Sequence, residues 1–329
     1  MDFSLFYFAH DSSDNDRYRL LLDGATFADT HGFTAVWTPE RHFHPFGGLY
    51  PNPSVTAAAI AGRTERVAIR AGSVVAPLHH PARIAEEWSM VDNLSGGRVG
   101  IAFASGWNAD DFVLNPSTFS SRRSSVQDAV RDVRRLWRGE PVPFPNGLGE
   151  VVDVRVYPRP VQAELPVWIT SSGSLATFET AGSLGVGVLT HLLGQDLDEL
   201  AGKLAAYRAA LPLGNPGHVV LMLHTFVGDD VKELVRQPFT DYLRGSLDLF
   251  LPPDVTLSDA DVEWMLGQAF ERYYTGGSLL GTVPENLEML DRLTALGVDE
   301  VACLIDFGLD TKQVLDGLTR LDELRRSAR

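Results

Sequence analysis

The chain has 329 residues, of which 44% are hydrophobic and 22% are charged, a composition typical of a folded globular protein and not of a disordered one. It carries 28 Lys and Arg residues against 43 Asp and Glu residues, so its formal net charge at pH 7 is −15. A surface this acidic repels phosphate backbones and anionic lipids, which argues against nucleic-acid binding and against membrane binding. The length allows two domains of about 150 residues, although α/β barrels of this size often form one.

The single cysteine, Cys303, rules out an internal disulfide bond and a zinc site built from paired cysteines. It lies in an apolar run, 301–305, and we therefore expect it to be buried as a small hydrophobic side chain. No basic region follows Met1 that would begin a signal peptide, and no stretch of about 18 apolar residues predicts a membrane span. These features favour a cytoplasmic enzyme or binding protein.

The first part of the chain alternates short apolar segments with segments of helical periodicity. Gly32 follows the first helical segment, where glycine commonly ends a helix, and Pro81 begins the third, where proline is favoured. β-branched and aromatic residues mark the segment 33–37 as a strand. Strands are predicted at 3–9, 33–37, 67–75 and 99–104, and helices at 17–31, 53–62, 81–94 and 121–137.

The second part continues the alternation after an interruption. Residues 140–164 hold several prolines and an alternating stretch, 152–156, which predicts an inserted hairpin rather than a further strand of the main sheet. Residues 229–274 predict two helices separated at Pro252 and Pro253. Further strands are predicted at 166–170, 186–189, 219–227 and 298–307, and further helices at 175–184, 197–211, 284–296 and 311–326.

About eight strand–helix units therefore follow one another, which predicts a parallel sheet covered by helices. Eight units in one chain of this length favour an α/β fold of the TIM (β/α)8 barrel type with insertions, formed by residues 1–329 as one domain. A doubly wound open sheet is the alternative. No GxGxxG or GxxxxGK[ST] motif follows a predicted strand, so neither a Rossmann dinucleotide site nor a P-loop is expected.

In a TIM barrel the active site lies at the C-terminal ends of the strands, so the segments that follow the strands are the candidates for chemistry. The segment 38–48 is rich in charged, histidine and aromatic residues, more than a plain connection needs. Glu40 and Arg41 could form a simple surface ion pair, or they could lie at the mouth of the barrel, where Trp107 could form the wall of a flat-ring site.

Histidines follow two neighbouring strands, which raises the question of a metal site. Imidazole is a good ligand for zinc and iron, and the candidates are His42, His44, His79 and His80. No HxxxH motif on a helix and no carboxylate pattern accompanies them, and the side chains of adjacent histidines diverge. We predict no metal.

Residues 171–174, Ser-Ser-Gly-Ser, follow a predicted strand and begin a predicted helix. Free backbone N–H groups, the positive end of the helix and short hydroxyl side chains are suited to bind a phosphate. The alternative is an ordinary helix N-cap, for which serine is also favoured.

The segment 33–43, Phe-Thr-Ala-Val-Trp-Thr-Pro-Glu-Arg-His-Phe, and blocks that follow it in order resemble the bacterial luciferase-like flavin monooxygenases over almost the whole chain. The further blocks are 46–47, 52–53, 77–87, 91–98, 105–107, 171–174 and 281–285. More narrowly, 39–44, 104–108 and 303–308 resemble a subfamily that accompanies polyketide and nonribosomal-peptide assembly lines.

The resemblance implies a TIM barrel that binds reduced FMN, supplied by a separate flavin reductase, and that transfers one oxygen atom from O2 to an organic substrate. The substrate would be a natural-product intermediate, free or tethered to an acyl or peptidyl carrier protein. The resemblance also implies a homodimer packed through helices near the second and third strands, and a mobile lid at residues 243–277 with hinges at 252–253 and 276–277.

The resemblance also implies roles for individual residues. A non-proline cis peptide under the flavin ring would fall at Gly72-Ser73, and the phosphate loop would fall at 171–174. The implied catalytic residues are Glu40, Arg41, His42 and His80, and the implied cofactor-binding residues are Gly72, Ser73, Ser105, Trp107, Ser171, Ser172, Gly173, Ser174 and His191.

The chain departs from the luciferases at three positions. Arg41 stands where they have a catalytic histidine, so the proton-transfer role would pass to His42, and Arg41 would stabilise negative charge or hold an acidic or carbonyl group of the substrate. Ser105 replaces a phosphate-binding arginine. Ala104 replaces a reactive cysteine, so light emission is not implied.

Three alternatives remain open. An F420-dependent hydride-transfer enzyme of the same barrel family would need more basic residues at the mouth than Arg41, Arg63 and Arg83. A flavin-binding protein without catalysis would not need charged groups above the ring. A sugar-phosphate barrel enzyme usually needs a lysine or metal-binding carboxylates, and the lysines of this chain, Lys203, Lys232 and Lys312, follow no predicted strand directly.

Overall fold

The computed structural model describes residues 1–8, 17–250 and 257–328. Its centre is a closed barrel of parallel strands, in the order β1-β2-β3-β4-β7-β8-β9-β11, with β11 paired to β1. These strands are β1 (Asp2–Phe6), β2 (Ala35–Thr38), β3 (Ala68–Val75), β4 (Val99–Ala104), β7 (Val167–Thr170), β8 (Gly187–His191), β9 (Val219–Val227) and β11 (Glu300–Leu304). The predicted TIM barrel is confirmed, with strand boundaries within a few residues of those expected.

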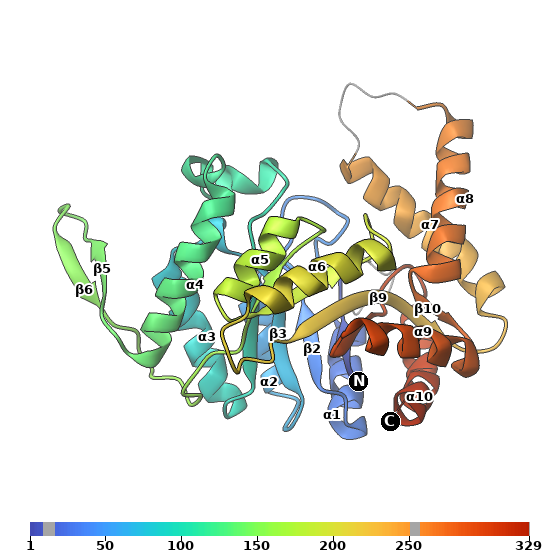
Figure 1. Cartoon of the computed structure of the whole chain (residues 1–329), viewed down its shortest axis with the longest axis horizontal. Helices are drawn as coiled ribbons and strands as arrows, with labels where there is room; N and C mark the ends of the chain where they lie inside the picture. The colour runs from blue at the N-terminus through green and yellow to red at the C-terminus, as the bar shows by residue number, and fades with distance from the viewer. Residues whose placement is uncertain (9–16, 251–256, 329) are drawn as a thin grey trace.

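Helices surround the barrel (Figure 1). Those that follow the strands are α1 (Arg19–His31), α2 (Pro53–Ala61), α3 (Pro81–Ser95), α4 (Arg122–Arg138), α5 (Leu175–Ser183), α6 (Leu197–Ala210), α9 (Val283–Leu296) and α10 (Thr311–Ser327). Local signals explain their ends: Gly32 ends α1 in the left-handed conformation at φ 76°, and the Asn52 side chain accepts a hydrogen bond from the Ser54 amide at 2.9 Å where α2 begins.

The predicted insertion is an antiparallel hairpin of β5 (Val142–Pro145) and β6 (Val151–Val154). It extends away from the barrel beside α4 (Figure 1). Leu148, at its tip, and Val151 are largely exposed. The hairpin therefore contributes no strand to the barrel, as the alternating pattern with prolines predicted.

The two helices predicted within 229–274 are α7 (Val231–Phe250) and α8 (Asp259–Gly276), which lie together over the C-terminal side of the barrel (Figure 1). The expected hinge at 252–253 lies outside the described residues. A short strand, β10 (Leu279–Gly281), follows α8 and was not predicted. It pairs in parallel with residues 225–227 of β9, beyond the part of β9 that pairs with β11, and three residues are too few to show a periodicity.

Near the N-terminal ends of the strands, the interior of the barrel holds a buried ion pair. Arg70 Nη1 and Glu300 Oε2 are 2.7 Å apart, and Glu300 Oε1 accepts hydrogen bonds from Ser4 and Trp37. The guanidinium lies against the rings of Trp37 and Trp168. The charges of Arg70 and Glu300 in this cluster therefore compensate each other.

Cys303 is fully buried, as expected for a small hydrophobic side chain, and burial raises its thiol pKa to about 12. Within the described part of the chain, no helix is long and apolar enough to cross a membrane.

Candidate active site

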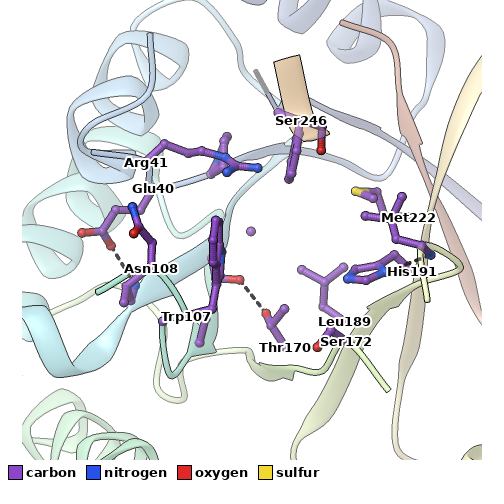
Figure 2. A pocket seen from close by; sticks show the side chains of 18 of the residues that line it. Glu40, Arg41, Trp107, Asn108, Thr170, Ser172, Leu189, His191, Met222 and Ser246 are labelled. Carbon is purple, nitrogen blue, oxygen red and sulfur yellow. Dashed lines mark hydrogen bonds between the residues drawn. The ribbon is translucent and has the colours of Figure 1, made fainter. Parts of the chain in front are cut away.

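A pocket of about 700 Å³ opens at the C-terminal ends of the barrel strands, where the sequence placed the site. The structure brings together, from segments far apart in the chain, the predicted residues Glu40, Arg41, His42, Gly72, Ser73, Ser105, Trp107, Ser172 and His191. Figure 2 shows Arg41 and Ser172 on opposite sides of this pocket, with Trp107 standing between them in the view. The predicted residues His80, Ser171, Gly173 and Ser174 do not line it.

Glu40, directly after β2, is buried and holds three partners. Its Oε1 accepts hydrogen bonds from His79 Nε2 at 2.6 Å and from His42 Nε2 at 2.9 Å, and its Oε2 accepts one from the Val75 amide at 2.7 Å. Burial alone would raise the Glu40 pKa, but the hydrogen bonds from the two histidines outweigh it and lower the pKa. Glu40 is therefore an ionised carboxylate that orients two imidazoles.

His79, not the predicted His80, is the second histidine that contacts Glu40, although His79 does not itself line the pocket. Burial would lower the pKa of His79, but the hydrogen bond and charge of Glu40 raise it. His80 is the N-cap of α3, where its Nδ1 accepts a hydrogen bond from the Ala82 amide, and its ring lies against Phe144 of the hairpin. The two residues are adjacent in sequence, and the backbone turn after η1 (Ala76–Leu78) points only one of them at Glu40.

Arg41 directly follows Glu40 in the chain, and its side chain reaches into the pocket (Figure 2). Its guanidinium carbon lies 3.9 Å from the centroid of the Phe8 ring and 5.6 Å from that of Phe46. Gly47, at φ 90°, makes room for it, because a Cβ there would lie 2.5 Å from Arg41 Cδ. Burial lowers the Arg41 pKa, although the group stays protonated near neutral pH.

The simple ion pair between Glu40 and Arg41, considered from the sequence, does not form. Glu40 is buried rather than exposed, and its carboxylate is occupied by His42, His79 and the Val75 amide. No carboxylate of the described residues lies within ion-pair distance of the Arg41 guanidinium. Among the described residues, the pocket therefore presents a cation that no carboxylate pairs with directly, although the charges of Asp111 and Asp306 act to raise the Arg41 pKa.

Asp111, in the segment after β4, is a titratable group that the sequence analysis did not single out. It lines the pocket, and its carboxylate accepts a hydrogen bond from Asn108 at 3.0 Å. Burial raises its pKa, against the opposing effects of His42, Asn108 and Arg41. Its position after a strand was the available signal, but nothing in the local sequence distinguished it from Asp110.

The peptide bond between Gly72 and Ser73 is cis, as the resemblance predicted, and both residues line the pocket. A Cβ at position 72 would lie 2.7 Å from the Phe6 ring and 3.1 Å from the Trp37 ring, so only glycine fits. The Ser73 hydroxyl lies 2.5 Å from the Thr170 hydroxyl. This segment forms a close-packed floor without a projecting apolar side chain.

The loop 171–174 lies after β7 at the far side of the pocket from Arg41. Ser172 lines the pocket, whereas the Ser171 hydroxyl accepts a hydrogen bond from the Gly173 amide at 3.3 Å. Ser174 is the N-cap residue of α5 but makes no side-chain capping bond. The alternative of an ordinary capping serine is therefore not supported, and the helix presents an N-terminus without a side-chain cap beside the pocket.

Much of the remaining wall is apolar. Phe8, Phe46, Tyr242 and Tyr273 line the pocket, the two tyrosines from α7 and α8. Phe46 belongs to the segment 38–48, which was a candidate for chemistry, whereas the other three lie within long helical or apolar segments without a local motif and were not predicted as pocket residues. Burial lowers the pKa of His191 to about 4, so this lining residue is neutral near pH 7 and adds no charge to the wall.

The four histidines considered for a metal are not gathered into one centre. His44 Nδ1 accepts a hydrogen bond from the Phe46 amide, and His42 and His79 both face Glu40. In the portion of the chain that the structure describes, no group of three or more His, Cys, Asp or Glu side chains could hold a metal ion.

Comparison with known proteins agrees with this geometry. Residues 1–298 match the model of the luciferase-like monooxygenase family. The chain is 25% identical over 346 aligned residues, covering 98% of it and 93% of the relative, to the oxygenase component of the flavin-dependent trigonelline monooxygenase of Acinetobacter baylyi. Over 52% of the chain, and 53% of the relative, it is 31% identical to the F420-dependent glucose-6-phosphate dehydrogenase of Amycolatopsis mediterranei.

Among solved structures, the monooxygenase RslO1 of Streptomyces bottropensis superposes with a TM-score of 0.82 at 23% identity, covering 99% of both chains, which is a likeness of fold. The family match covers most of the chain and spans the segments that form the pocket. The protein therefore belongs to the luciferase-like monooxygenase family.

Proposed function

We propose that the protein is a reduced-FMN-dependent monooxygenase that inserts one oxygen atom from O2 into an organic substrate, a natural-product biosynthetic intermediate. The observation that carries the proposal is one pocket bounded on one side by the Gly72-Ser73 floor and on another by the loop 171–174. A flat ring system fits a floor without a projecting apolar side chain, and a phosphate fits a helix N-terminus. FMN combines these two groups.

Bound in reduced form, FMN supplies the electrons that activate O2. The residues of this chain would then exclude water, hold the substrate and move protons. Phe8, Tyr242 and Tyr273 supply apolar surface, which disfavours water at the reacting centre. Arg41 would hold an acidic or carbonyl group of the substrate, and His42, oriented by Glu40, would transfer a proton.

The pocket supports FMN over the alternative cofactor F420. The alternative is favoured by the similarity of about half of the chain to an F420-dependent dehydrogenase. F420 carries a long acidic tail, which favours several cations at the mouth. Arg41 alone among the arginines and lysines lines the described pocket. Arg63 and Arg83, considered from the sequence, lie within ion-pair distance of Asp23 and Glu87 instead.

An anaerobic titration tests the cofactor assignment. The purified protein is mixed with reduced FMN or with reduced F420, and binding is followed by calorimetry before O2 is admitted. We expect binding of reduced FMN and O2 consumption that yields an oxygenated product from a co-supplied intermediate. Binding of reduced F420 alone, with hydride transfer and no O2 consumption, would establish the F420-dependent alternative. Binding of FMN without any turnover would favour the non-catalytic flavin protein.

The partners expected from the sequence also remain proposals. A flavin reductase would supply the reduced cofactor, and a carrier protein could deliver a tethered substrate. The cytoplasmic location stays a prediction.

The expected homodimer gains support from exposed apolar side chains on α2 and α3, two helices that pack against each other. Val55 on α2 and Met90 and Leu94 on α3 are more than half exposed. Sedimentation equilibrium of the wild-type protein and of a Val55→Glu, Leu94→Glu variant tests it. We expect a dimer that the variant converts to a monomer; a wild-type monomer at all concentrations would contradict the proposal.

A further inference from the structure

A lysine that follows no strand in the sequence lies beside the loop 171–174 in the structure. Lys203 is in the second turn of α6, which packs against α5. Its Nζ lies 3.4 Å from the position that a Cβ on Gly173 would occupy. The ammonium therefore sits against the loop that begins α5, although Lys203 is 30 residues further along the chain than Gly173.

Gln195 holds Lys203 in this place. The Gln195 side chain is 2% exposed, and its Nε2 donates hydrogen bonds to the His191 carbonyl at 2.7 Å and to Thr190 Oγ1 at 3.0 Å. Thr190 in turn donates to the Ser171 carbonyl at 2.8 Å. With both amide hydrogens engaged, Gln195 Oε1 has a defined direction, and it accepts a hydrogen bond from Lys203 Nζ at 2.8 Å.

The charge of Lys203 is not neutralised by this partner. Gln195 offers a neutral oxygen, and in the described parts of the chain no carboxylate lies within ion-pair distance of Lys203. The other two lysines differ, since Lys232 is paired with Glu271 at 2.8 Å and Lys312 with Asp316 at 2.5 Å. An ammonium has three N–H donors, so Lys203 retains donors for an anion next to the α5 N-terminus without a side-chain cap.

We propose that Lys203, positioned by Gln195, binds the terminal phosphate of the cofactor and makes the site select a phosphorylated flavin over the unphosphorylated one. The inference rests on the proposed function, because it takes FMN as the occupant of the pocket. The cation and the helix N-terminus approach the loop from two elements, so a phosphomonoester there would receive hydrogen bonds from both.

Binding of two cofactors that differ only in the phosphate tests the proposal. Dissociation constants for reduced FMN and reduced riboflavin are measured anaerobically by calorimetry on the wild type, on Lys203→Ala and on the matched control Lys312→Ala. We expect the wild type to prefer FMN, Lys203→Ala to lose about tenfold or more of that preference with riboflavin affinity unchanged, and Lys312→Ala to keep it. Added salt should reduce the wild-type preference.

The outcomes separate this inference from the proposed function. If Lys203→Ala keeps the full preference for FMN, the role of Lys203 is wrong while FMN dependence stands. If the wild type binds both flavins equally, the site does not sense the phosphate, and the inference is wrong while flavin dependence stands. If the wild type binds neither flavin, both proposals are wrong.

A second variant tests the positioning by Gln195. Gln195→Glu places a carboxylate beside the Lys203 ammonium, where the ion pair would neutralise the cation, and it also removes the two hydrogen bonds that Gln195 Nε2 donates to the His191 carbonyl and to Thr190. We expect this variant to lose the FMN preference to a similar extent, and its riboflavin affinity measures how far the loss of those two hydrogen bonds disturbs the pocket. A Gln195→Glu protein with the wild-type preference would contradict the role assigned to Gln195.

Discussion

Two arginines stack on aromatic rings at opposite ends of the same barrel, and they differ in one respect. The guanidinium carbon of Arg70 lies 5.0 Å from the centroid of the Trp37 ring and 4.6 Å from that of Trp168, and that of Arg41 lies 3.9 Å from the centroid of the Phe8 ring. Arg70 is paired with Glu300 at 2.7 Å. Arg41 has no carboxylate at ion-pair distance among the described residues, and it faces a pocket.

The comparison distinguishes a charge whose partner is built into the fold from a charge that faces a pocket without such a partner. A buried cation whose partner is built into the fold stabilises one conformation and leaves nothing for a ligand. A buried cation without a paired carboxylate retains part of its desolvation cost, which an anionic or carbonyl group of a ligand can offset. We therefore propose different roles for the same side chain at the two ends, structural for Arg70 and functional for Arg41.

The largest expected effect comes from breaking the buried ion pair between Arg70 and Glu300. Glu300→Ala leaves Arg70 buried without its partner, and we expect the free energy of unfolding to fall by about 3 to 5 kcal/mol. Urea denaturation at pH 7 measures it, with Arg41→Ala as the matched control, which should change stability far less. An equal loss in both variants would contradict the distinction between the two ends.

The contribution of Glu300 to the stability of the protein should depend on pH in a definite direction. Burial alone would raise the Glu300 pKa, but Arg70 and the hydrogen bonds lower it below the ordinary value of 4.5. A carboxyl whose pKa is lower in the folded state contributes stability above 4.5 and loses it as pH falls through the folded pKa. The acid limb of the wild-type stability curve should therefore be steeper than that of Glu300→Gln.

The second prediction concerns the removal of Arg41 from the pocket. Arg41→Ala should lower product formation by about tenfold to a hundredfold, because a charge-assisted contact to the substrate or to developing negative charge is lost. Hydrogen peroxide release should rise, and FMN binding should change little. Arg41→Lys should restore only part of the activity, since an ammonium lacks the planar fork of a guanidinium. Full coupling of O2 uptake to product in Arg41→Ala would show that Arg41 only shapes the loop.

The third prediction concerns Glu40, a buried anion in the same segment as Arg41 whose side-chain partners are two histidines. Glu40→Gln removes the charge that raises the His79 pKa, so that pKa should fall, and stability should decrease by about 1 to 3 kcal/mol at pH 6. The contribution of a histidine with a raised pKa is complete below about 6.5 and disappears as pH rises through the folded pKa. The part of the stability difference between wild type and Glu40→Gln that comes from protonated His79 should therefore disappear at alkaline pH. Denaturation at several pH values and NMR titration of His79 measure this.

His42, the second imidazole on Glu40, carries the proton-transfer role in the proposal. His42→Ala should slow product formation while leaving FMN binding nearly unchanged, because a positioned proton donor or acceptor is lost. Product formation at the wild-type rate would move that role to another group, and Asp111 is then the next candidate because it lines the same pocket.

The smallest expected effect concerns the serines of the loop 171–174, where the proposed function places the phosphate. The double variant Ser171→Ala, Ser174→Ala should weaken FMN binding less than Ser172→Ala does, because Ser172 faces the pocket and the Ser171 hydroxyl is engaged with the Gly173 amide. We expect up to about tenfold for Ser172→Ala, with riboflavin as the control ligand. A larger loss in the double variant would place the phosphate on the side of Ser171 and Ser174.

The sequence by itself determined the architecture, because the signals for it are local. Short apolar runs followed by helical periodicity recur at each barrel unit, and residues such as Gly32 and Asn52 end or begin helices through their own backbone and side-chain preferences. The alternation of strands and helices also predicted the end of the barrel at which the candidate site lies, because the C-terminal ends of parallel strands meet at one end. The resemblance added the cis peptide at Gly72-Ser73, which the structure contains.

Only the tertiary structure decided which side chains meet at that edge. Residue spacing could not choose between His79 and His80 as the partner of Glu40, because the choice depends on the turn through η1 and on the pairing of β2 with β3. Nor could it place Tyr242 in the pocket or Lys203 beside Gly173, since these contacts join elements far apart along the chain. Such contacts are set by how helices pack around the closed barrel, and that geometry depends on the whole fold rather than on any local pattern.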